Sequence, residues 1–136
     1  MKVLGVNHVT LSVRDLERSF RFYVDAVGLK PVARWYKGAY LEAGADWICL
    51  TLDDDVRVGS LPEYTHIAFT VSREDFLSSV ERLRAAQVEC WQENHSEGES
   101  FYFLDPDGHK LELHVGTLAS RMDALKSRPP RELEIF

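Results

Sequence analysis

Residues 7–13 read Asn-His-Val-Thr-Leu-Ser-Val, and residues 65–71 read Thr-His-Ile-Ala-Phe-Thr-Val. In both stretches a histidine is followed by apolar residues at every second position, which predicts a half-buried β-strand. A polar helix start and a helical stripe of apolar residues follow each stretch within a few positions. The chain therefore contains two copies of one strand-then-helix unit, opened by His8 and by His66.

Each copy continues into three further strands. In the first copy a helix capped by Asp15 ends at Gly28, and in the second a helix begins at Ser72. We expect opening strands over residues 3–13 and 64–71, and later strands over 30–35, 39–43, 47–52, 88–91, 100–104 and 110–115. A last helix over 117–128 is expected to turn Leu118, Met122 and Leu125 inward. The predicted fold is α+β, a single domain over 1–136 with two βαβββ modules (1–57 and 63–115) that close one curved sheet around a cavity.

A carboxylate completes the most informative pattern. Glu112 lies in the last predicted strand, on the same face as Lys110 and His114, because side chains alternate along a strand. Two imidazoles and one carboxylate form a metal-ligand set that leaves coordination positions open, as a catalytic metal requires. We therefore predict His8, His66 and Glu112 as metal ligands. The counterpart of Glu112 in the first module is expected near Thr51, which is not a competent ligand.

Composition limits the classes of function. The formal net charge of −6 argues against a nucleic-acid binder, because no basic stripe is present to neutralise phosphates. No apolar run approaches the length of a membrane span and no leader precedes His8, so we expect a soluble, cytoplasmic protein that does not bind a membrane. Cys49 and Cys90 are interpreted as buried thiols.

Several stretches resemble the vicinal-oxygen-chelate superfamily, known also as the glyoxalase and bleomycin-resistance superfamily. The closer likeness is to its glutathione-dependent fosfomycin-resistance proteins. It is carried by residues 7–11, 33–35, 38–42, 47–50 and 64–66, and above all by the long stretch from Asn94 to Glu112. The resemblance implies Mn²⁺ at His8, His66 and Glu112. It also implies a homodimer in which exchanged modules share each site, with His8 from one subunit and the other two ligands from its partner.

The same resemblance implies the remaining site residues and an activity. The activity is addition of the glutathione thiol to the epoxide of fosfomycin, with Thr10, Tyr102 and Arg121 as catalytic groups. A potassium-binding loop matches Asn94, Ser96, Gly98 and Ser100. The expected substrate contacts are Trp35, Lys37, Tyr40, Trp47, Gln92, Ser96 and Ser100. His109 and His114 are interpreted as surface residues or as residues that touch the ligands.

The sequence departs from that family at four positions. Gln92 stands where the family usually has Lys, and His95 where it usually has Arg. Lys37 replaces a polar residue, and Pro130 replaces a Tyr. These changes leave the predicted metal ligands intact. They affect the residues expected to bind the substrate and the thiol cosubstrate.

Other activities of the superfamily stay open. An epoxide hydrolase would need a carboxylate base near residues 37–39, where no acidic residue occurs. Glyoxalase-type isomerisation generally uses a further carboxylate ligand, and ring-cleaving dioxygenases use the same ligand set on iron. A non-enzymatic drug-binding protein would use an apolar dimer groove without a metal.

Overall fold

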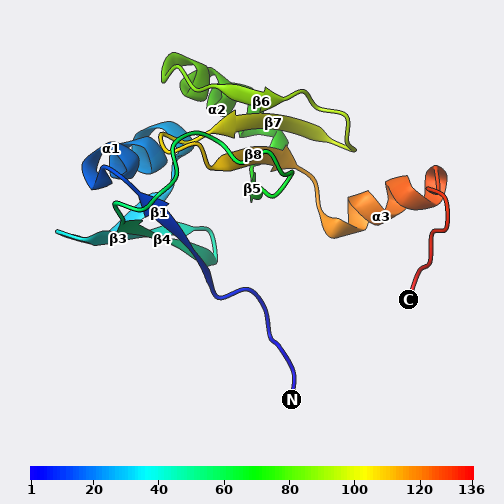
Figure 1. Cartoon of the computed structure of the whole chain (residues 1–136). Helices are drawn as coiled ribbons and strands as arrows, with labels where there is room; N and C mark the ends of the chain where they lie inside the picture. Colours follow the sequence, from blue (N-terminus) through cyan, green and yellow to red (C-terminus); the bar gives the residue numbers. More distant parts are fainter.

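Two modules of the same topology make up the chain, followed by one helix (Figure 1). The computed structural model describes residues 1–136. The first module contains β1 (His8–Val13), α1 (Leu16–Arg21), the π-helix η1 (Phe22–Val27), β2 (Lys30–Trp35), β3 (Gly38–Ala43) and β4 (Asp46–Leu52). The second contains β5 (Ile67–Thr70), α2 (Arg73–Ala85), β6 (Cys90–Gln92), β7 (Glu99–Leu104) and β8 (Lys110–Val115), and α3 (Leu118–Ser127) ends the chain's regular structure. The predicted α+β class and duplicated βαβββ order are confirmed.

Each module folds into a four-stranded sheet with the same strand order. The orders are β1-β4-β3-β2 and β5-β8-β7-β6. The opening strand of each module pairs in parallel with the last, and the other pairs are antiparallel. Because the two sheets are separate, β1 and β5 each keep one edge unpaired, and such edges are open to pairing with another chain.

The helices cover one face of each sheet and form the hydrophobic core there. Leu11, Leu41 and Leu50 are buried in the first module, and Leu83 and Leu113 in the second. The predicted helix starts are confirmed, since the Asp15 side chain accepts from the Arg18 amide and the Ser72 hydroxyl from the Asp75 amide. The helix-covered faces thus hold the fold together, and the opposite faces remain available for other contacts.

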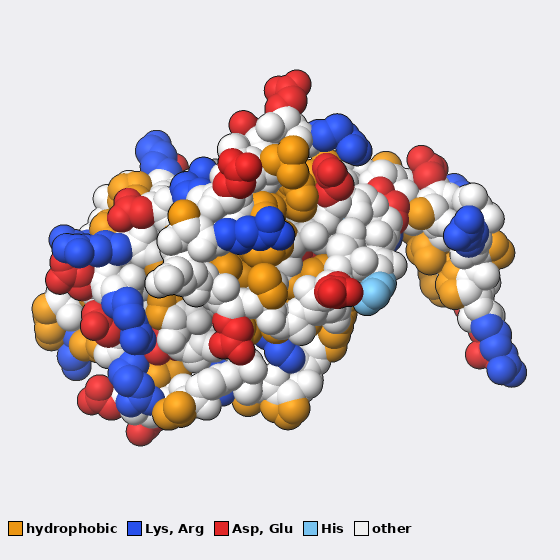
Figure 2. All heavy atoms as spheres, turned by 90° about the horizontal axis from the view of Figure 1, so that it is seen from above, with side chains coloured by type: hydrophobic (Ala, Val, Ile, Leu, Met, Phe, Trp, Pro, Cys, Tyr) orange, Lys and Arg blue, Asp and Glu red, His pale blue; other side chains and the backbone are white.

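The single chain differs from the predictions at four points: two strand starts, the last helix and the cysteines. β1 begins at His8, because Val3 and Leu4 are exposed and lie beside no strand. Likewise β5 begins at Ile67, later than the pattern suggested. No residue of α3 is fully buried, because the helix stands apart from both sheets (Figures 1 and 2). Of the three residues expected to face inward, Leu118 is 78% exposed, and Met122 and Leu125 are half-buried. Both cysteines are free, yet Cys90 is exposed and Cys49 only half-buried.

None of these helices combines the length and apolar character that crossing a bilayer requires. The longest, α2, has 13 residues and carries charges along its exposed side.

Buried polar contacts join the modules at the turn between β7 and β8. The Tyr23 hydroxyl, from η1, donates to Asp105 Oδ2 at 2.7 Å. Burial, followed by the nearby charge of Asp105, raises the pKa of Tyr23, so the phenol keeps its proton as a donor. The second Asp105 oxygen accepts from the amides of Asp107 and His109. In the same turn Asp107 accepts from the Ser19 hydroxyl at 3.3 Å.

Tyr23→Phe is expected to lower the free energy of unfolding by about 1.5–3 kcal/mol, because a buried carboxylate oxygen loses its donor. Chemical denaturation followed by circular dichroism measures the change. Tyr36→Phe is the matched control, because Tyr36 is 83% exposed and its loss of a hydroxyl should change stability by less than about 0.5 kcal/mol. Equal effects of the two substitutions would contradict the role of the Tyr23 contact.

Candidate metal and anion site

The predicted site residues that belong to strands, Thr10, Tyr40, Glu112 and Tyr102 among them, lie on the sheet faces that the helices leave uncovered. In the first module, register places Thr10, Cys49 and Tyr40 side by side in one row. In the second module, Ala68, Glu112 and Tyr102 form the corresponding row. The two rows have the same position relative to the opening histidines, so the duplicated fold presents two matching half-sites.

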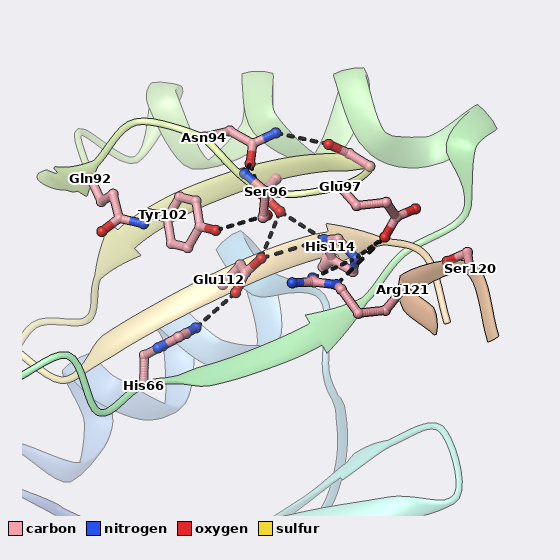
Figure 3. A network of polar contacts seen from close by, with 12 residues as sticks. His66, Gln92, Asn94, Ser96, Glu97, Tyr102, Glu112, His114, Ser120 and Arg121 are labelled. Carbon is pink, nitrogen blue, oxygen red and sulfur yellow. Dashed lines mark hydrogen bonds and ion pairs between the residues drawn. The ribbon is translucent and has the colours of Figure 1, made fainter. Parts of the chain in front are cut away.

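His66 and Glu112 meet on the face of the second module (Figure 3). His66 Nε2 lies 2.8 Å from Glu112 Oε2, and both side chains are largely shielded from solvent. His66 Nδ1 lies 2.8 Å from the Tyr64 carbonyl oxygen, which can only accept, so Nδ1 carries a proton. In a neutral ring Nε2 then has its lone pair directed at a carboxylate oxygen. Two facing acceptors repel one another unless a cation or a second proton lies between them.

His8 is arranged in the same way in the first module. Its Nδ1 lies 2.7 Å from the Asn7 side-chain oxygen, an arrangement that leaves Nε2 free. Its ring stacks on Trp47 at a centroid distance of 4.2 Å. The single chain does not bring His8 to the other two predicted ligands, because no cluster of three metal-ligating side chains forms within it.

The donor set fits a divalent metal. Two ligands at right angles around a metal at about 2.1 Å lie about 3.0 Å apart, close to the observed separation of His66 Nε2 and Glu112 Oε2. Backbone or side-chain carbonyls hold Nδ1 of both His66 and His8, which is how proteins orient metal-binding imidazoles. Each chain therefore carries one prepared pair of ligands and, separately, one prepared imidazole.

Aromatic rings surround His66, and sequence reasoning missed two of them. The ring centroids of Tyr64, Trp91 and Tyr102 lie 5.0, 5.3 and 6.0 Å from that of His66. Only Tyr102 was expected at the site. Tyr64 was predicted only as part of a strand, and Trp91 ends a short predicted strand, so no local pattern marked either one. These rings limit the access of water to the His66–Glu112 pair.

The loop over residues 94–100 is organised by Asn94. Its side-chain oxygen accepts from both the amide and the hydroxyl of Ser96, and its amide donates to the Gly98 carbonyl at 2.8 Å. The Ser96 hydroxyl also lies 3.4 Å from the Tyr102 hydroxyl, which links the loop to the sheet face. Gly98 has a φ of +80°, and a side chain there would collide with the Val115 carbonyl oxygen. The loop thus depends on glycine and holds several oxygens near Tyr102.

The other predicted contact residues divide between the two modules. In the second, Gln92 donates to the Tyr64 hydroxyl at 3.0 Å, and Arg121 on α3 lies beside His114 and Glu97. In the first, Tyr40 packs edge-on against both Trp35 and Trp47. Lys37 lies at the β2–β3 turn over the ring of Tyr36 and contacts none of the others.

The counterpart of Glu112 is Cys49, and the expectation of Thr51 was wrong. Glu112 pairs with Ala68, two residues after His66, and the residue two after His8 is Thr10, whose partner is Cys49. Thr51 pairs instead with Ser12 and corresponds to His114. The error arose because the second module has more residues than the first between its opening histidine and this position, 46 (112 minus 66) against 41 (49 minus 8).

Comparison with known proteins agrees with this architecture. Residues 5–113 match the glyoxalase/bleomycin resistance protein/dioxygenase superfamily. The chain is 52% identical over 127 residues to the glutathione transferase FosA of Serratia marcescens, covering 92% of this chain and 90% of that protein. It is 38% identical over 130 residues to the metallothiol transferase FosB of Staphylococcus epidermidis, covering 93% and 92%.

A solved structure gives the same result in three dimensions. The fosfomycin resistance protein FosX from Listeria monocytogenes, complexed with Mn(II) and sulfate ion, matches with a TM-score of 0.77 at 33% identity, covering 90% of this chain and 98% of that one. The chain belongs to the glyoxalase/bleomycin resistance protein/dioxygenase superfamily and, within it, to the fosfomycin-resistance proteins.

Proposed function

We propose that this protein is a Mn²⁺-dependent glutathione transferase that adds the glutathione thiol to the epoxide of fosfomycin. One observation carries the proposal: His66 and Glu112 face each other as a metal-binding pair in a chain 52% identical to a named glutathione transferase. The solved relative complexed with Mn(II) and sulfate ion supports both a divalent metal and an oxyanion as ligands.

The site is completed, in this proposal, by a second copy of the chain. His8 and Thr10 on the uncovered face of one subunit meet His66 and Glu112 of the other. Two observations support such a homodimer: no three ligands converge within one chain, and the edges of β1 and β5 are unpaired. Exposed apolar side chains on α3, such as Leu118, are consistent with cover from a partner.

The residues present suggest how the reaction proceeds. The sulfur–carbon bond forms as the epoxide carbon–oxygen bond breaks, the thiol loses its proton to solvent, and the alkoxide gains one. His8, His66 and Glu112 would hold Mn²⁺, which would supply Lewis-acid polarisation of the ring oxygen. The Thr10 hydroxyl donates to the oxygen on which charge develops. Arg121 offers the phosphonate a planar pair of donors, and Tyr102 lies beside Glu112 in register.

The remaining predicted contacts fit the same proposal. Trp47, Tyr40 and Trp35 form a connected aromatic wall on the first module, suited to the apolar part of the substrate. Gln92 supplies a neutral amide, and Lys37 lies at the exposed β2–β3 turn, where a glutathione carboxylate could reach its ammonium.

Product analysis tests the function directly. The Mn²⁺-loaded protein is mixed with fosfomycin and with glutathione, cysteine or no thiol, and products are followed by ³¹P NMR and mass spectrometry. We expect a glutathione adduct that forms only with Mn²⁺ present. A diol formed without thiol would identify an epoxide hydrolase, and the absence of any product would contradict the proposed function.

We also propose that the loop over residues 94–100 binds K⁺ near the phosphonate. K⁺ is expected to raise kcat/KM about tenfold, because one added positive charge close to an anion is worth about 1.4 kcal/mol. Gly98→Ala should abolish this activation, since it crowds the Val115 carbonyl and strains a left-handed backbone by about 1–2 kcal/mol. Steady-state kinetics with and without KCl measure the effect.

Gly44→Ala is the matched control for that experiment. Gly44 also has a positive φ, of +63°, but a side chain there meets no atom within 4 Å. It should therefore keep the activation by K⁺. If Gly98→Ala responds to K⁺ as the unmodified protein does, the loop is not the cation site.

A further inference from the structure

A continuous row of polar side chains runs from Glu112 to α3 (Figure 3). Ser100 on β7 lies directly opposite His114 on β8, and Glu112 is two residues along β8 on the same face. The Ser100 hydroxyl lies 2.6 Å from Glu112 Oε1 and 2.7 Å from His114 Nδ1. At its other nitrogen, His114 Nε2 lies 3.5 Å from an Arg121 guanidinium nitrogen. Four residues from three elements are thus connected in one chain of contacts.

Counting protons fixes the direction of this chain. The Ser100 hydroxyl has one proton, and its short contact with the Glu112 carboxylate requires that proton. The contact between Ser100 and His114 must therefore use a proton on His114 Nδ1. In the neutral ring Nε2 is then an acceptor, which suits Arg121 because a guanidinium only donates. Each donor in the sequence Arg121, His114, Ser100 has a matching acceptor.

The imidazole of His114 is held in a slot between two glycines. A side-chain carbon at Gly116 would lie 2.6 Å from His114 Nε2, and one at Gly98 would lie 3.1 Å from Cε1. Only 14% of the His114 side chain is exposed. The Glu97 carboxylate adds a negative charge 3.9 Å from Nε2 and 3.6 Å from Arg121 Nε. Backbone and charge together confine the ring.

The two Glu112 oxygens have different partners. Oε1 accepts from Ser100 at 2.6 Å and lies 3.4 Å from His114 Nδ1, and Oε2 faces His66. Oε2 is therefore the oxygen turned toward the other ligand of this module, and the Ser100 hydroxyl, whose proton goes to Oε1, is not free to donate to a bound anion. The contacts of Arg121 with His114 and Glu97 are also the polar contacts that tie α3 to the sheet.

We infer that His114 is a positioning residue that acts through Ser100 to fix which Glu112 oxygen binds the metal, and that it links this carboxylate to Arg121. The inference rests on the proposed metal site but not on the identity of the substrate. Residues that orient a metal ligand typically contribute 10–100-fold to metal affinity. His114 and Ser100 together are expected to contribute the same 10–100-fold to Mn²⁺ affinity.

The test measures Mn²⁺ affinity without substrate, by electron paramagnetic resonance of the free ion. His114→Phe keeps a ring in the slot but removes both nitrogens, and it should weaken Mn²⁺ binding 10–100-fold, within the typical range. His114→Asn keeps a donor at the position of Nδ1, and should bind Mn²⁺ within about threefold of the unmodified protein. A merely structural role would not separate these two variants.

A double-mutant cycle shows whether His114 acts through Ser100. Ser100→Ala should weaken Mn²⁺ binding as much as His114→Phe does, and the double variant should be no weaker than either single variant. Additive losses, or unchanged affinity in His114→Phe, would overturn the inference. Thermal melting controls for folding, and Ser100→Ala alone still decides the question if His114→Phe does not fold.

The outcome is separable from that of the proposed function. If the unmodified protein forms no adduct with glutathione, the proposed function fails. The Mn²⁺ affinities of the variants still test whether His114 positions Glu112. If the adduct forms but Mn²⁺ affinity is insensitive to His114, only the positioning role fails.

Discussion

Glu112→Ala is expected to lower kcat/KM by at least about a thousandfold and to remove tight Mn²⁺ binding. The substitution deletes one of three proposed protein ligands and the only negative charge among them. A metal acting as a Lewis acid contributes several kcal/mol to stabilising the transition state, and each 1.36 kcal/mol corresponds to a factor of ten in rate. Steady-state turnover of fosfomycin and titration of Mn²⁺ measure the two losses.

The control for this prediction is a carboxylate far from the site. Glu17 on α1 forms an exposed ion pair with Arg21, at 2.7 Å, and such surface pairs contribute little to stability. Glu17→Gln should keep both turnover and Mn²⁺ affinity within about twofold. If Glu112→Ala retains the metal and more than about a tenth of the activity, Glu112 is not a ligand and the proposed centre is misassigned.

The alternation of apolar residues was enough to predict the duplicated order of strands and helices. Predictions of helix starts and ends were reliable, because they depend on contacts between residues close in the sequence. Asp15 and Ser72 cap their helices through nearby amides, and Gly28 ends the first helix with a φ of +97°. Predictions that depended on contacts between distant segments were weaker. The inward face expected for α3 is only half-buried at Met122 and Leu125 and is exposed at Leu118, because helical spacing does not say whether a surface is available to cover it.

The candidate site was predictable in part for a similar reason. His66 and Glu112 converge because strand alternation and parallel pairing bring them to one face, and both can be recognised in a sequence. The role of His114 depends on a slot between Gly98 and Gly116 and on the direction of the Ser100 proton. Neither leaves a pattern in the sequence. Tyr64 and Trp91 lie at the ends of predicted strands, and strand alternation does not say which distant ring such a residue will meet, so their approach to His66 could be found only in the fold.

Register also corrected a conclusion about symmetry. Counting residues between modules suggested Thr51 as the counterpart of Glu112, whereas strand pairing identifies Cys49. Insertions in loops change the count without moving the strands. Pairing is therefore the sounder guide to equivalent positions in a duplicated fold.

The second large effect is recovery of activity from two inactive variants. His8→Ala and Glu112→Ala are each expected to be inactive as homodimers. When they are mixed, unfolded and refolded together, half of the dimers should contain one copy of each. One of the two sites in such a dimer takes both altered residues, and the other takes His8 and Glu112 intact. About a quarter of the activity of the unmodified protein should return.

Mixing His66→Ala with Glu112→Ala provides the matched control. Both residues belong to the second module, so every site in the mixed dimer lacks one of them, and no activity should return.

The most direct measurement of whether two subunits build each catalytic centre is the turnover of the refolded mixture of His8→Ala and Glu112→Ala. Recovery of about a quarter of the normal rate, with none in the control mixture, is the result expected when β1 of one subunit faces β8 of its partner. A mixture as inactive as its two components, in solutions where mixed dimers are demonstrated by mass, would contradict this arrangement of the active site.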